Sequence, residues 1–447
     1  MRPSKRDLVS IDDLSSAEIM ELFRHANEFR EDLRAWSHLC RGSIMATLFF
    51  EPSTRTRLSF ESAMLRLGGG VISAADPSTT STVKGESLAD TVRVVGGAYA
   101  DILVVRHPQD GAARVAAHYA KVPVINGGDG AHEHPTQTLC DLYTLWREKG
   151  DLAGLDVVLC GDLRYSRTVH SFAYALARFS ANIITVPYPG FEMPQFVLDR
   201  LSREFGVQAS AASVGELPGI AGGENSAAYL TASRPHQLAL FTSLSPVHLE
   251  RIDAIYMTRA QRERHRGEST ANYPRISRAS MASELMRDAR VMHPLPRVDE
   301  IDYDVDDDPR SIYFQQAELG VPMRMALMAF QLGAIRLETS PGAEGVPSRP
   351  TAPVRGLRCR NDRCITNGEG RLYLTAEFRQ VTEWPPRLAC AYCGQELDAP
   401  YVGSATTNRV HRHDCADARR IRPENRVFFE SEEQARVAGF RPDEPAG

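Results

Sequence analysis

The sequence lacks long apolar runs and any large excess of one charge. No segment approaches the ~18 consecutive apolar residues that a membrane-spanning helix needs, and the first residues, MRPSKRDLVSIDDL, lack the apolar core of a secretory signal. Lys and Arg total 52 and Asp and Glu total 57, for a formal net charge of -5, so the whole chain is not attracted to nucleic acid or anionic membranes. We therefore expect a cytoplasmic protein without a membrane partner, in which any anion-binding site is local.

Biased composition is absent as well. Of the 447 residues, 43% are hydrophobic and 24% are charged, which is ordinary for globular proteins and excludes wholesale disorder. At roughly 100–200 residues per domain, this length predicts two to four packed domains.

The eight cysteines are unevenly distributed. Cys40, Cys140 and Cys160 stand singly in apolar segments, where filling the core is favoured over a catalytic thiol. The other five lie in the last ninety residues. In a reducing compartment such crowding indicates metal binding rather than disulfides.

Up to about residue 337, short apolar runs alternate with longer segments of helical period, which is the pattern of parallel α/β sheets. The expected strands are residues 44–49, 102–105, 122–125, 157–160, 183–186 and 254–257. The expected helices are residues 16–33, 57–67, 136–148, 166–179 and 322–337. The segment 338–356 has four prolines and three glycines without apolar period, and it is expected to be a linker.

An anion site is indicated where the strand at 44–49 ends. The following residues 51–57, EPSTRTR, offer hydroxyls, an arginine and free backbone N–H groups at a helix start, and these groups suit an anion of phosphate size. A plain N-cap role for the Ser-Thr pair is equally compatible with this segment alone. However, RHP at 106–108 and HPTQ at 134–137 follow other strands, and ligands of open α/β sheets bind beyond the carboxyl ends of strands.

Several segments together resemble the catalytic chains of aspartate carbamoyltransferases, in that family's order across residues 5–337. They are FEPSTRTRLSFE, VKGESLADT, RHP, GDGAHEHPTQTLCDLYT, GDLRYSRTVHS, YMTRAQRER, HPLPRVDEI and YFQQAELGVP. Ornithine transcarbamoylases typically carry His-Cys-Leu-Pro where this chain has HPLPR at 293–297, which favours aspartate. The resemblance implies an α/β protein with two parallel-sheet domains of transcarbamoylase type. These are a carbamoyl phosphate-binding domain at 1–150 and an aspartate-binding domain at 151–337, whose last helix returns to the first domain.

The resemblance implies transfer of the carbamoyl group of carbamoyl phosphate to L-aspartate, giving N-carbamoyl-L-aspartate and phosphate in pyrimidine biosynthesis. Positioning and electrostatics suit this chemistry, because carbamoyl phosphate is already activated and needs neither a protein nucleophile nor a catalytic metal. By resemblance, the catalytic residues are Arg55, Thr56, Lys84, Arg106 and His134. The carbamoyl phosphate site comprises Ser53, Thr54, Arg55, Thr56, Arg106, His134, Gln137, Leu295 and Pro296, and the aspartate site comprises Lys84, Arg167, Arg259 and Gln261.

The loop that carries Lys84 is polar, and in the family it reaches into the neighbouring subunit's site. This resemblance implies a homotrimer, with Ser81 as a further candidate from the same loop. Residues 215–251 are longer than the family's usual connection. A surface insertion is favoured there, and a lid near the aspartate pocket is the alternative.

Near the C-terminus, Cys359-x4-Cys364 is followed after 25 residues by Cys390-x2-Cys393. Four thiolates in two close pairs predict a closed, tetrahedral and therefore structural Zn²⁺ site. Residues 357–400, with an expected strand at 372–378, resemble the zinc domain of the same enzymes' regulatory chain, a small β domain. In the family that domain contacts catalytic chains between trimers, which implies further assembly.

Residues 401–447 form an expected short α+β tail, which resembles small zinc modules but lacks their Cys-x-x-Cys pair. Cys415 remains, with His411 and His413 as candidate substitutes for the other ligands. Arginines in this tail would allow a DNA contact, but a solvated face is favoured, so a nucleic-acid partner is not expected. Two alternatives stay open for the whole chain: a transcarbamoylase for another amino acid, and a scaffold for a partner enzyme of the pyrimidine pathway.

Overall fold

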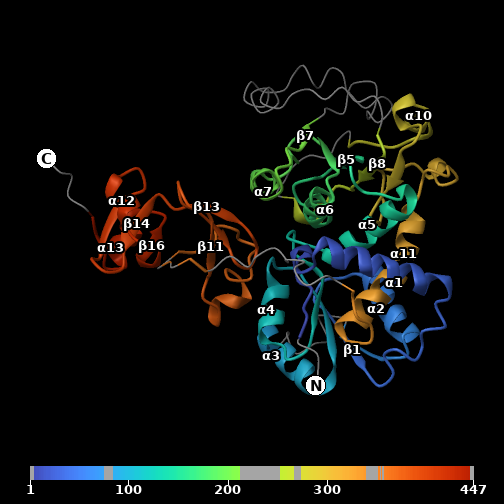
Figure 1. Cartoon of the computed structure of the whole chain (residues 1–447), viewed down its shortest axis with the longest axis horizontal. Helices are drawn as coiled ribbons and strands as arrows, with labels where there is room; N and C mark the ends of the chain where they lie inside the picture. Colours follow the sequence, from blue (N-terminus) through green and yellow to red (C-terminus); the bar gives the residue numbers. More distant parts are fainter. Residues whose placement is uncertain are drawn as a thin grey trace.

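Parallel strands form two separate sheets in the first part of the chain (Figure 1). The computed structural model describes residues 5–74, 84–211, 252–265, 273–338, 351–352, 354 and 357–442. The first sheet has the order β2-β1-β3-β4 and consists of β1 (Ile44–Phe49), β2 (Gly70–Ala74), β3 (Ile102–His107) and β4 (Val124–Asp129). The second has the order β7-β6-β5-β8-β9 and consists of β5 (Asp156–Gly161), β6 (Asn182–Pro187), β7 (Ser210–Ala211), β8 (Ala254–Met257) and β9 (Arg290–Met292).

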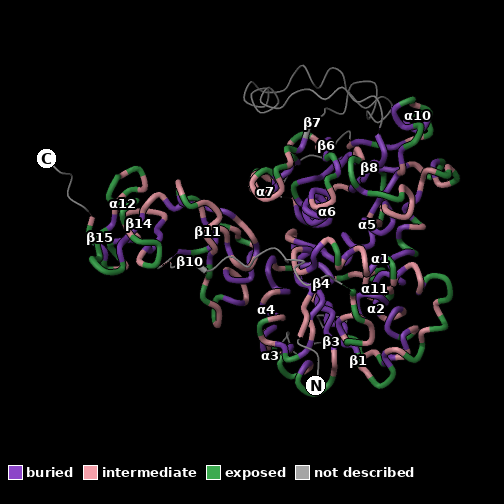
Figure 2. The backbone as a smooth tube through the Cα atoms, in the orientation of Figure 1, coloured by how far each residue is buried: buried purple, intermediate pink, exposed green. Residues whose placement is uncertain are grey.

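Helices cover both sheets and leave the central strands buried (Figure 2). Strand β3 is buried at every position, which explains why its first four residues, 102–105, are an unbroken apolar run rather than an alternating one. The helices of this part are α1 (Ser16–Glu31), α2 (Thr54–Arg66), α3 (Leu88–Val94), α4 (Ala112–Tyr119), α5 (Pro135–Lys149), α6 (Arg167–Arg178), α7 (Gln195–Phe205), α10 (Arg278–Met281) and α11 (Tyr313–Gln331). The parallel α/β class is therefore confirmed.

Helix α11 packs against α1, α2 and α5, so the chain returns from the second sheet to the first (Figure 1). The expected start of this helix at residue 322 is wrong, because α11 begins at Tyr313 and contains Pro322 in its interior. An interior proline removes one backbone hydrogen bond, but most of α11 is buried, and this packing outweighs the local preference.

Two small β-sheets follow. The first is antiparallel and consists of β10 (Thr351–Ala352), β11 (Phe378–Thr382), β12 (Arg387–Cys390) and β13 (Glu396–Asp398). The second contains β14 (Tyr401–Ser404), β15 (Arg409–Arg412), β16 (Arg426–Phe429) and β17 (Arg441–Pro442), with helices α12 (Ala416–Arg420) and α13 (Glu432–Val437). We call residues 357–398 the cysteine segment and residues 401–442 the C-terminal module.

Three sequence expectations need correction or lie outside the described residues. The strand expected at 372–378 is wrong, since residues 369–372 form a 3-10 helix, Leu374 N–H bonds to the Gly370 carbonyl at 2.7 Å, and β11 starts only at Phe378. The expected linker 338–356 lies mostly outside the described residues, but Thr351 and Ala352 pair with β11 and are not linker. The expected insertion 215–251 lies outside them entirely.

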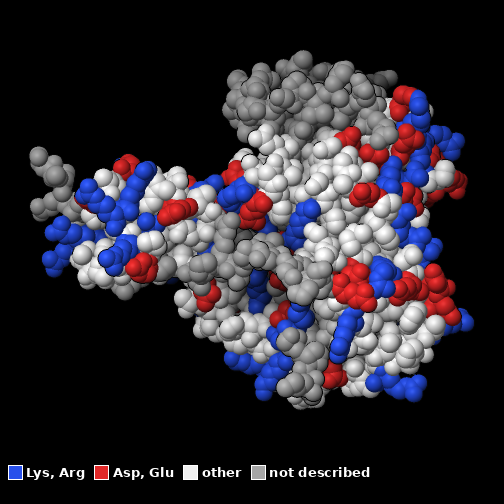
Figure 3. Space-filling view, viewed as in Figure 1, with Lys and Arg blue, Asp and Glu red and all other residues white. Residues whose placement is uncertain are grey.

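The early cysteines are core residues, as expected. Burial raises the pKa of the Cys40 and Cys140 thiols to about 11 and that of Cys160 to about 12, which keeps them unreactive. Acidic and basic side chains are interspersed over the face shown in Figure 3. Within the described residues, no helix is long and apolar enough to cross a membrane.

Candidate active site

A cavity of about 400 Å³ lies at the carboxyl ends of strands from both parallel sheets. Residues that follow β1, β4, β8 and β9 line it, together with the start of α6. The cavity collects twelve of the expected site residues: Ser53, Thr54, Arg55, Thr56, Arg106, His134, Gln137, Arg167, Arg259, Gln261, Leu295 and Pro296.

Strand register brings the first of these groups together. Phe49 at the end of β1 pairs with Arg106 in β3, so the EPSTRTR segment leaves the sheet beside the Arg106 side chain. Gly128 in β4 has φ +111°, and a Cβ there would lie 2.9 Å from Arg167 Cζ and 3.1 Å from an Arg106 guanidinium nitrogen. Glycine at this position is therefore what allows two arginines to converge.

The start of α2 keeps its polar groups available. Ser53 occupies the N-cap position, but its side chain makes no capping hydrogen bond, so the plain N-cap alternative does not hold. The first N–H groups of a helix have no partner within the helix, and here they adjoin the cavity. Burial and the charge of Arg259 lower the pKa of Arg55, and no side-chain partner of Arg55 occurs among the described residues.

Glu51 holds the arginines of the cavity in place. Its Oε1 accepts hydrogen bonds from Arg106 at 2.8 Å and from Arg167 at 3.0 Å, and Arg264 lies 3.6 Å away. Burial alone would raise the pKa of Glu51, but the three guanidinium charges hold this pKa below its ordinary value. Burial and the neighbouring charge of Arg167 lower the pKa of Arg106 to about 9 and that of Arg264 to about 10.

Sequence reasoning assigned no role to Glu51 or Arg264, although both stand within the quoted motifs. Their positions in the sequence give no sign of the contact, because Glu51 follows β1 of the first sheet and Arg264 follows β8 of the second. The available signal was charge, because four arginines expected in one pocket (Arg55, Arg106, Arg167 and Arg259) favour a nearby carboxylate.

His134 is buried against arginines. Burial, followed by the charges of Arg167 and Arg106, holds the pKa of His134 well below its ordinary value, so its imidazole is neutral at neutral pH. The Thr136 hydroxyl lies 3.3 Å from its Nδ1. A neutral imidazole keeps one N–H donor that can polarise a carbonyl oxygen.

Gln137 is held by a buried carboxyl. Asp141 accepts hydrogen bonds from Gln137 Nε2 at 2.7 Å, from Gln316 Nε2 at 2.6 Å and from the Tyr256 hydroxyl at 2.8 Å. These donors come from α5, α11 and β8, so one carboxyl joins elements of both sheets at the cavity wall. Burial raises the pKa of Asp141 to about 6.

The second half supplies a carboxylate-binding group. Arg259 donates two parallel hydrogen bonds to Glu263, at 2.9 Å and 2.6 Å. Burial would raise the pKa of Glu263, but its hydrogen bond to Arg259 lowers this pKa to about 2. Gln261 is fixed by a backbone hydrogen bond from its N–H to the buried Asp162, at 3.0 Å.

Two expected residues are not brought to this cavity. Lys84 is exposed and does not line it in the single chain. Ser81 lies outside the described residues.

The four C-terminal cysteines converge on one point. Their ligand atoms lie within 4.8 Å of one another, with Cys359 Sγ 3.5 Å from Cys393 Sγ and Cys364 Sγ 3.8 Å from Cys390 Sγ. Zn–S bonds of about 2.3 Å in a tetrahedron place sulfurs about 3.8 Å apart, so the cluster fits a closed four-thiolate metal site. The Thr366 hydroxyl lies 3.2 Å from Cys364 Sγ, where it can donate to a thiolate.

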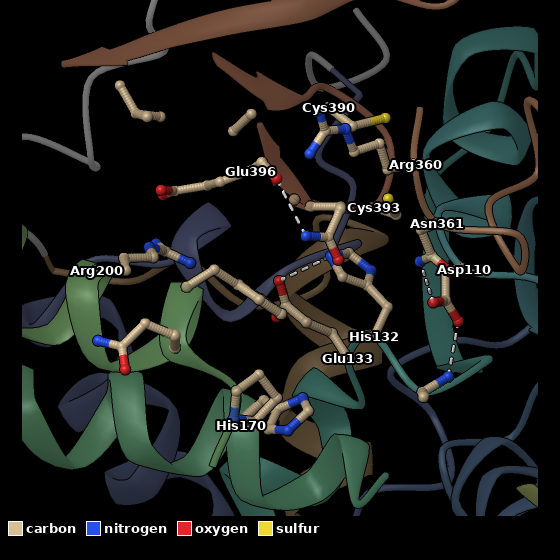
Figure 4. A pocket seen from close by; sticks show the side chains of 18 of the residues that line it. Asp110, His132, Glu133, His170, Arg200, Arg360, Asn361, Cys390, Cys393 and Glu396 are labelled. Carbon is tan, nitrogen blue, oxygen red and sulfur yellow. Dashed lines mark hydrogen bonds and ion pairs between the residues drawn. The ribbon is translucent and has the colours of Figure 1, made fainter. Parts of the chain in front are cut away.

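The cysteine segment docks directly after β3. Asp110 N–H donates to the Arg363 carbonyl and Ile365 N–H to the Asp110 carbonyl, both at 2.9 Å, and Asn361 Nδ2 donates to the Asp110 carboxylate at 2.7 Å (Figure 4). Arg203 of α7 pairs with Glu396 at 2.7 Å. Between these contacts lies a larger cavity of about 740 Å³, and none of its lining residues also lines the 400 Å³ cavity.

Comparisons with known families agree with this organisation. Residues 6–147 match the carbamoyl phosphate-binding domain of aspartate and ornithine carbamoyltransferases, and residues 226–331 match the Asp/Orn-binding domain. Residues 354–402 match the metal-binding domain of the aspartate carbamoyltransferase regulatory chain. The chain therefore belongs to the aspartate/ornithine carbamoyltransferase family.

Within this family the chain resembles aspartate enzymes. An aspartate carbamoyltransferase catalytic subunit from Clostridium botulinum is 43% identical over 334 residues, which cover 73% of this chain and 98% of the relative. The catalytic subunit of M. jannaschii aspartate transcarbamoylase superposes with a TM-score of 0.60 at 40% identity, covering 73% of this chain and 98% of that one. The Trypanosoma cruzi enzyme in complex with carbamoyl phosphate has the same TM-score of 0.60 at 34% identity, covering 73% and 95%.

Proposed function

We propose that this chain is an aspartate carbamoyltransferase, which transfers the carbamoyl group of carbamoyl phosphate to L-aspartate in pyrimidine biosynthesis. The observation that carries this proposal is the single cavity that joins the open start of α2 to buried arginines and a neutral histidine. Those groups complement a phosphate, a carbonyl oxygen and two carboxylates. The metal-binding match and the aspartate relatives support the same assignment.

The α2 start would bind the phosphate. Ser53, Thr54 and Thr56 bring hydroxyls, and Arg55 brings a charge with no competing partner among the described residues. Charge-assisted hydrogen bonds to a phosphate are about twice as strong as neutral ones, and they strengthen as the leaving group gains charge.

Thr56, Arg106 and His134 would polarise the carbonyl group of carbamoyl phosphate. Gln137 would orient the carbamoyl nitrogen, and Leu295 and Pro296 would border that nitrogen. The amino group of aspartate attacks the carbonyl carbon, and the C–O bond to phosphate breaks. The amine proton passes to the departing phosphate. His134 suits the oxyanion because its neutral ring retains one N–H group, which can donate a hydrogen bond to the oxygen as negative charge develops there.

The carboxylates of aspartate would be bound by Arg167 and Arg259, with Gln261 beside them. In the structure each of these arginines already binds a carboxylate side chain, Glu51 and Glu263 respectively. These contacts support the proposal, because a substrate carboxylate would compete for the same guanidinium donors.

We also propose a homotrimer in which Lys84, and Ser81 with it, completes the site of a neighbouring subunit. Exposure of Lys84 away from its own cavity is compatible with this arrangement. The proposed domains are 1–150 for carbamoyl phosphate, 151–337 for aspartate, 338–356 as linker apart from Thr351 and Ala352, 357–400 for structural Zn²⁺ and 401–447 as the tail. The domain at 357–400 would mediate assembly beyond the trimer or bind a partner enzyme of the pyrimidine pathway.

The substrate assay that tests this proposal offers carbamoyl phosphate with L-aspartate, L-ornithine or other amines to the purified full chain. Carbamoylated product and phosphate are both measured. Turnover with aspartate and none with ornithine is expected. Preference for another amine would support the transcarbamoylase alternative, and no turnover with any amine would favour the scaffold.

A further inference from the structure

Three metal-ligating side chains meet in the C-terminal module, away from both the catalytic cavity and the four-cysteine cluster. They are His411 in β15, Cys415 just before α12, and Asp417 in the first turn of α12, and their ligand atoms all lie within 4.8 Å of one another. A tight turn produces this arrangement, because Cys415 N–H bonds to the Arg412 carbonyl at 3.0 Å and folds α12 back toward the strand.

The donor set suits zinc. Imidazole nitrogen, thiolate sulfur and carboxylate oxygen bind Zn²⁺ at about 2.0–2.3 Å, which corresponds to ligand separations of about 3.3–3.8 Å in a tetrahedron. The ligand atoms of the three side chains, all within 4.8 Å of one another, lie close to those separations. His413, the other histidine of this turn, lies outside the cluster. Its ring packs edge-on against that of Trp384, with 6.3 Å between the ring centroids.

The competing contact of Asp417 is weak. Its Oδ1 accepts a hydrogen bond from Arg420 at 2.8 Å, but the two side chains are 50% and 79% exposed. Exposed ion pairs contribute little to stability, so a divalent ion would readily displace this one.

This cluster differs in kind from the four-cysteine site. The four cysteines are all buried, whereas His411 and Cys415 are half-buried and Asp417 is exposed. His411 and Asp417 also line a cavity of about 440 Å³, together with the hydroxyl residues Ser404, Thr406 and Thr407. A metal held by three ligands here would keep a coordination position open to that cavity.

We propose that His411, Cys415 and Asp417 bind a second zinc ion, independent of the four-cysteine site, with one position open to water or to a small anionic ligand. The ion would also fasten α12 to β15. Such a link is useful, because α12 is a helix of only five residues whose one buried residue is Ala418.

The test is the zinc content of the full chain after exhaustive dialysis, measured by elemental analysis against protein concentration. Two zinc ions per wild-type chain are expected, and one in His411→Ala and in Cys415→Ser. The matched control is His413→Ala, which alters a histidine of the same turn outside the cluster and should retain two. Because this readout is metal content, it does not depend on the proposed transferase activity.

A single zinc per wild-type chain would overturn the proposal. Two zinc ions retained by the doubly substituted His411→Ala, Cys415→Ser chain would do so as well. Asp417→Asn provides a milder variant that keeps the side-chain shape, and it should lose its second zinc to a chelator at lower concentration than wild type. Equal chelator resistance of this variant and wild type would remove Asp417 from the site.

Discussion

At the residue scale, buried charges organise the catalytic cavity, and each has its partners on a different element. Glu51 after β1 binds Arg106 in β3 and Arg167 in α6, and Asp141 in α5 binds donors from β8 and α11. Breaking one member of such a network leaves the others buried without a partner, which costs more than the net contribution of the contact itself. These carboxyl groups therefore fix the substrate-facing residues without themselves belonging to the expected binding set.

Asp141 predicts a defined pH dependence of stability. Its folded-state pKa is about 6 against an ordinary value of 3.8, so between these pH values the folded chain binds a proton that the unfolded chain has lost. As pH rises through this window the folded state loses that advantage, by about 3 kcal/mol at most. Asp141→Asn does not titrate, so the variant should gain stability relative to wild type from pH 4 to 6.5, measured by denaturant unfolding. A stability difference that stays constant over this range would contradict the prediction.

At the element scale, the cysteine segment contacts the catalytic part at elements that carry assigned residues. Glu369 accepts hydrogen bonds from Leu88 N–H at the start of α3, at 2.5 Å, and from the Tyr373 hydroxyl at 2.7 Å. Its other oxygen lies 3.7 Å from His107 Nε2, next to Arg106 in β3. Helix α3 follows Lys84 by four residues, so one glutamate reaches both the end of the Lys84 loop and β3.

Glu369→Ala should therefore weaken docking and lower kcat/KM by a few-fold, since the Leu88 N–H loses a carboxylate acceptor worth ~1.5–3 kcal/mol. Steady-state kinetics and thermal unfolding measure the two effects. Glu377→Ala is the matched control, because Glu377 is an exposed glutamate of the same segment whose side chain makes no hydrogen bond to the catalytic part among the described residues. If the two variants have the same kcat/KM and the same thermal unfolding midpoint, Glu369 does not contribute to docking of the cysteine segment or to catalysis.

Local sequence patterns predicted the elements with strong signals. The apolar runs predicted the observed bounds of β1 and β8, and the paired cysteine spacing predicted that the four cysteines converge. Patterns failed where distant packing decides the structure: Pro322 lies inside a helix because α1, α2 and α5 surround it. Likewise, no spacing along the chain could reveal that Glu51, which follows β1, lies 3.6 Å from Arg264, which follows β8 of the other sheet.

At the scale of the whole molecule, the catalytic cavity and the cysteine cluster are separate. The four-thiolate site leaves no ligand position for substrate, so its metal should act on assembly rather than on chemistry. Chelation of the metal bound to the full chain, or the substitution Cys390→Ser, should dissociate any assembly larger than a trimer. Turnover should fall by no more than a few-fold. Native mass and activity are measured on the same sample. An intact large assembly without bound metal, or lost turnover in intact trimers, would contradict this separation.

A composite site predicts complementation between inactive subunits. Lys84→Ala chains retain Arg55, and Arg55→Ala chains retain Lys84, so a mixed trimer contains some sites with both intact residues. Mixing the two variants under conditions of subunit exchange should restore part of the activity. Exchange proven by mass spectrometry without any recovery would show that Lys84 does not act across subunits.

The most direct measurement of the central claim compares two neighbouring arginines of α2. Arg55 lines the catalytic cavity, whereas Arg57, one residue beyond Thr56, lies outside it and its guanidinium is 3.5 Å from the Ser73 hydroxyl. The rate of carbamoyl aspartate formation should fall by about 100-fold or more in Arg55→Ala, because this variant lacks the positive charge that stabilises the departing phosphate. The rate should stay near wild type in Arg57→Ala. An Arg55→Ala enzyme within tenfold of wild type would contradict the assignment of this cavity as the active site.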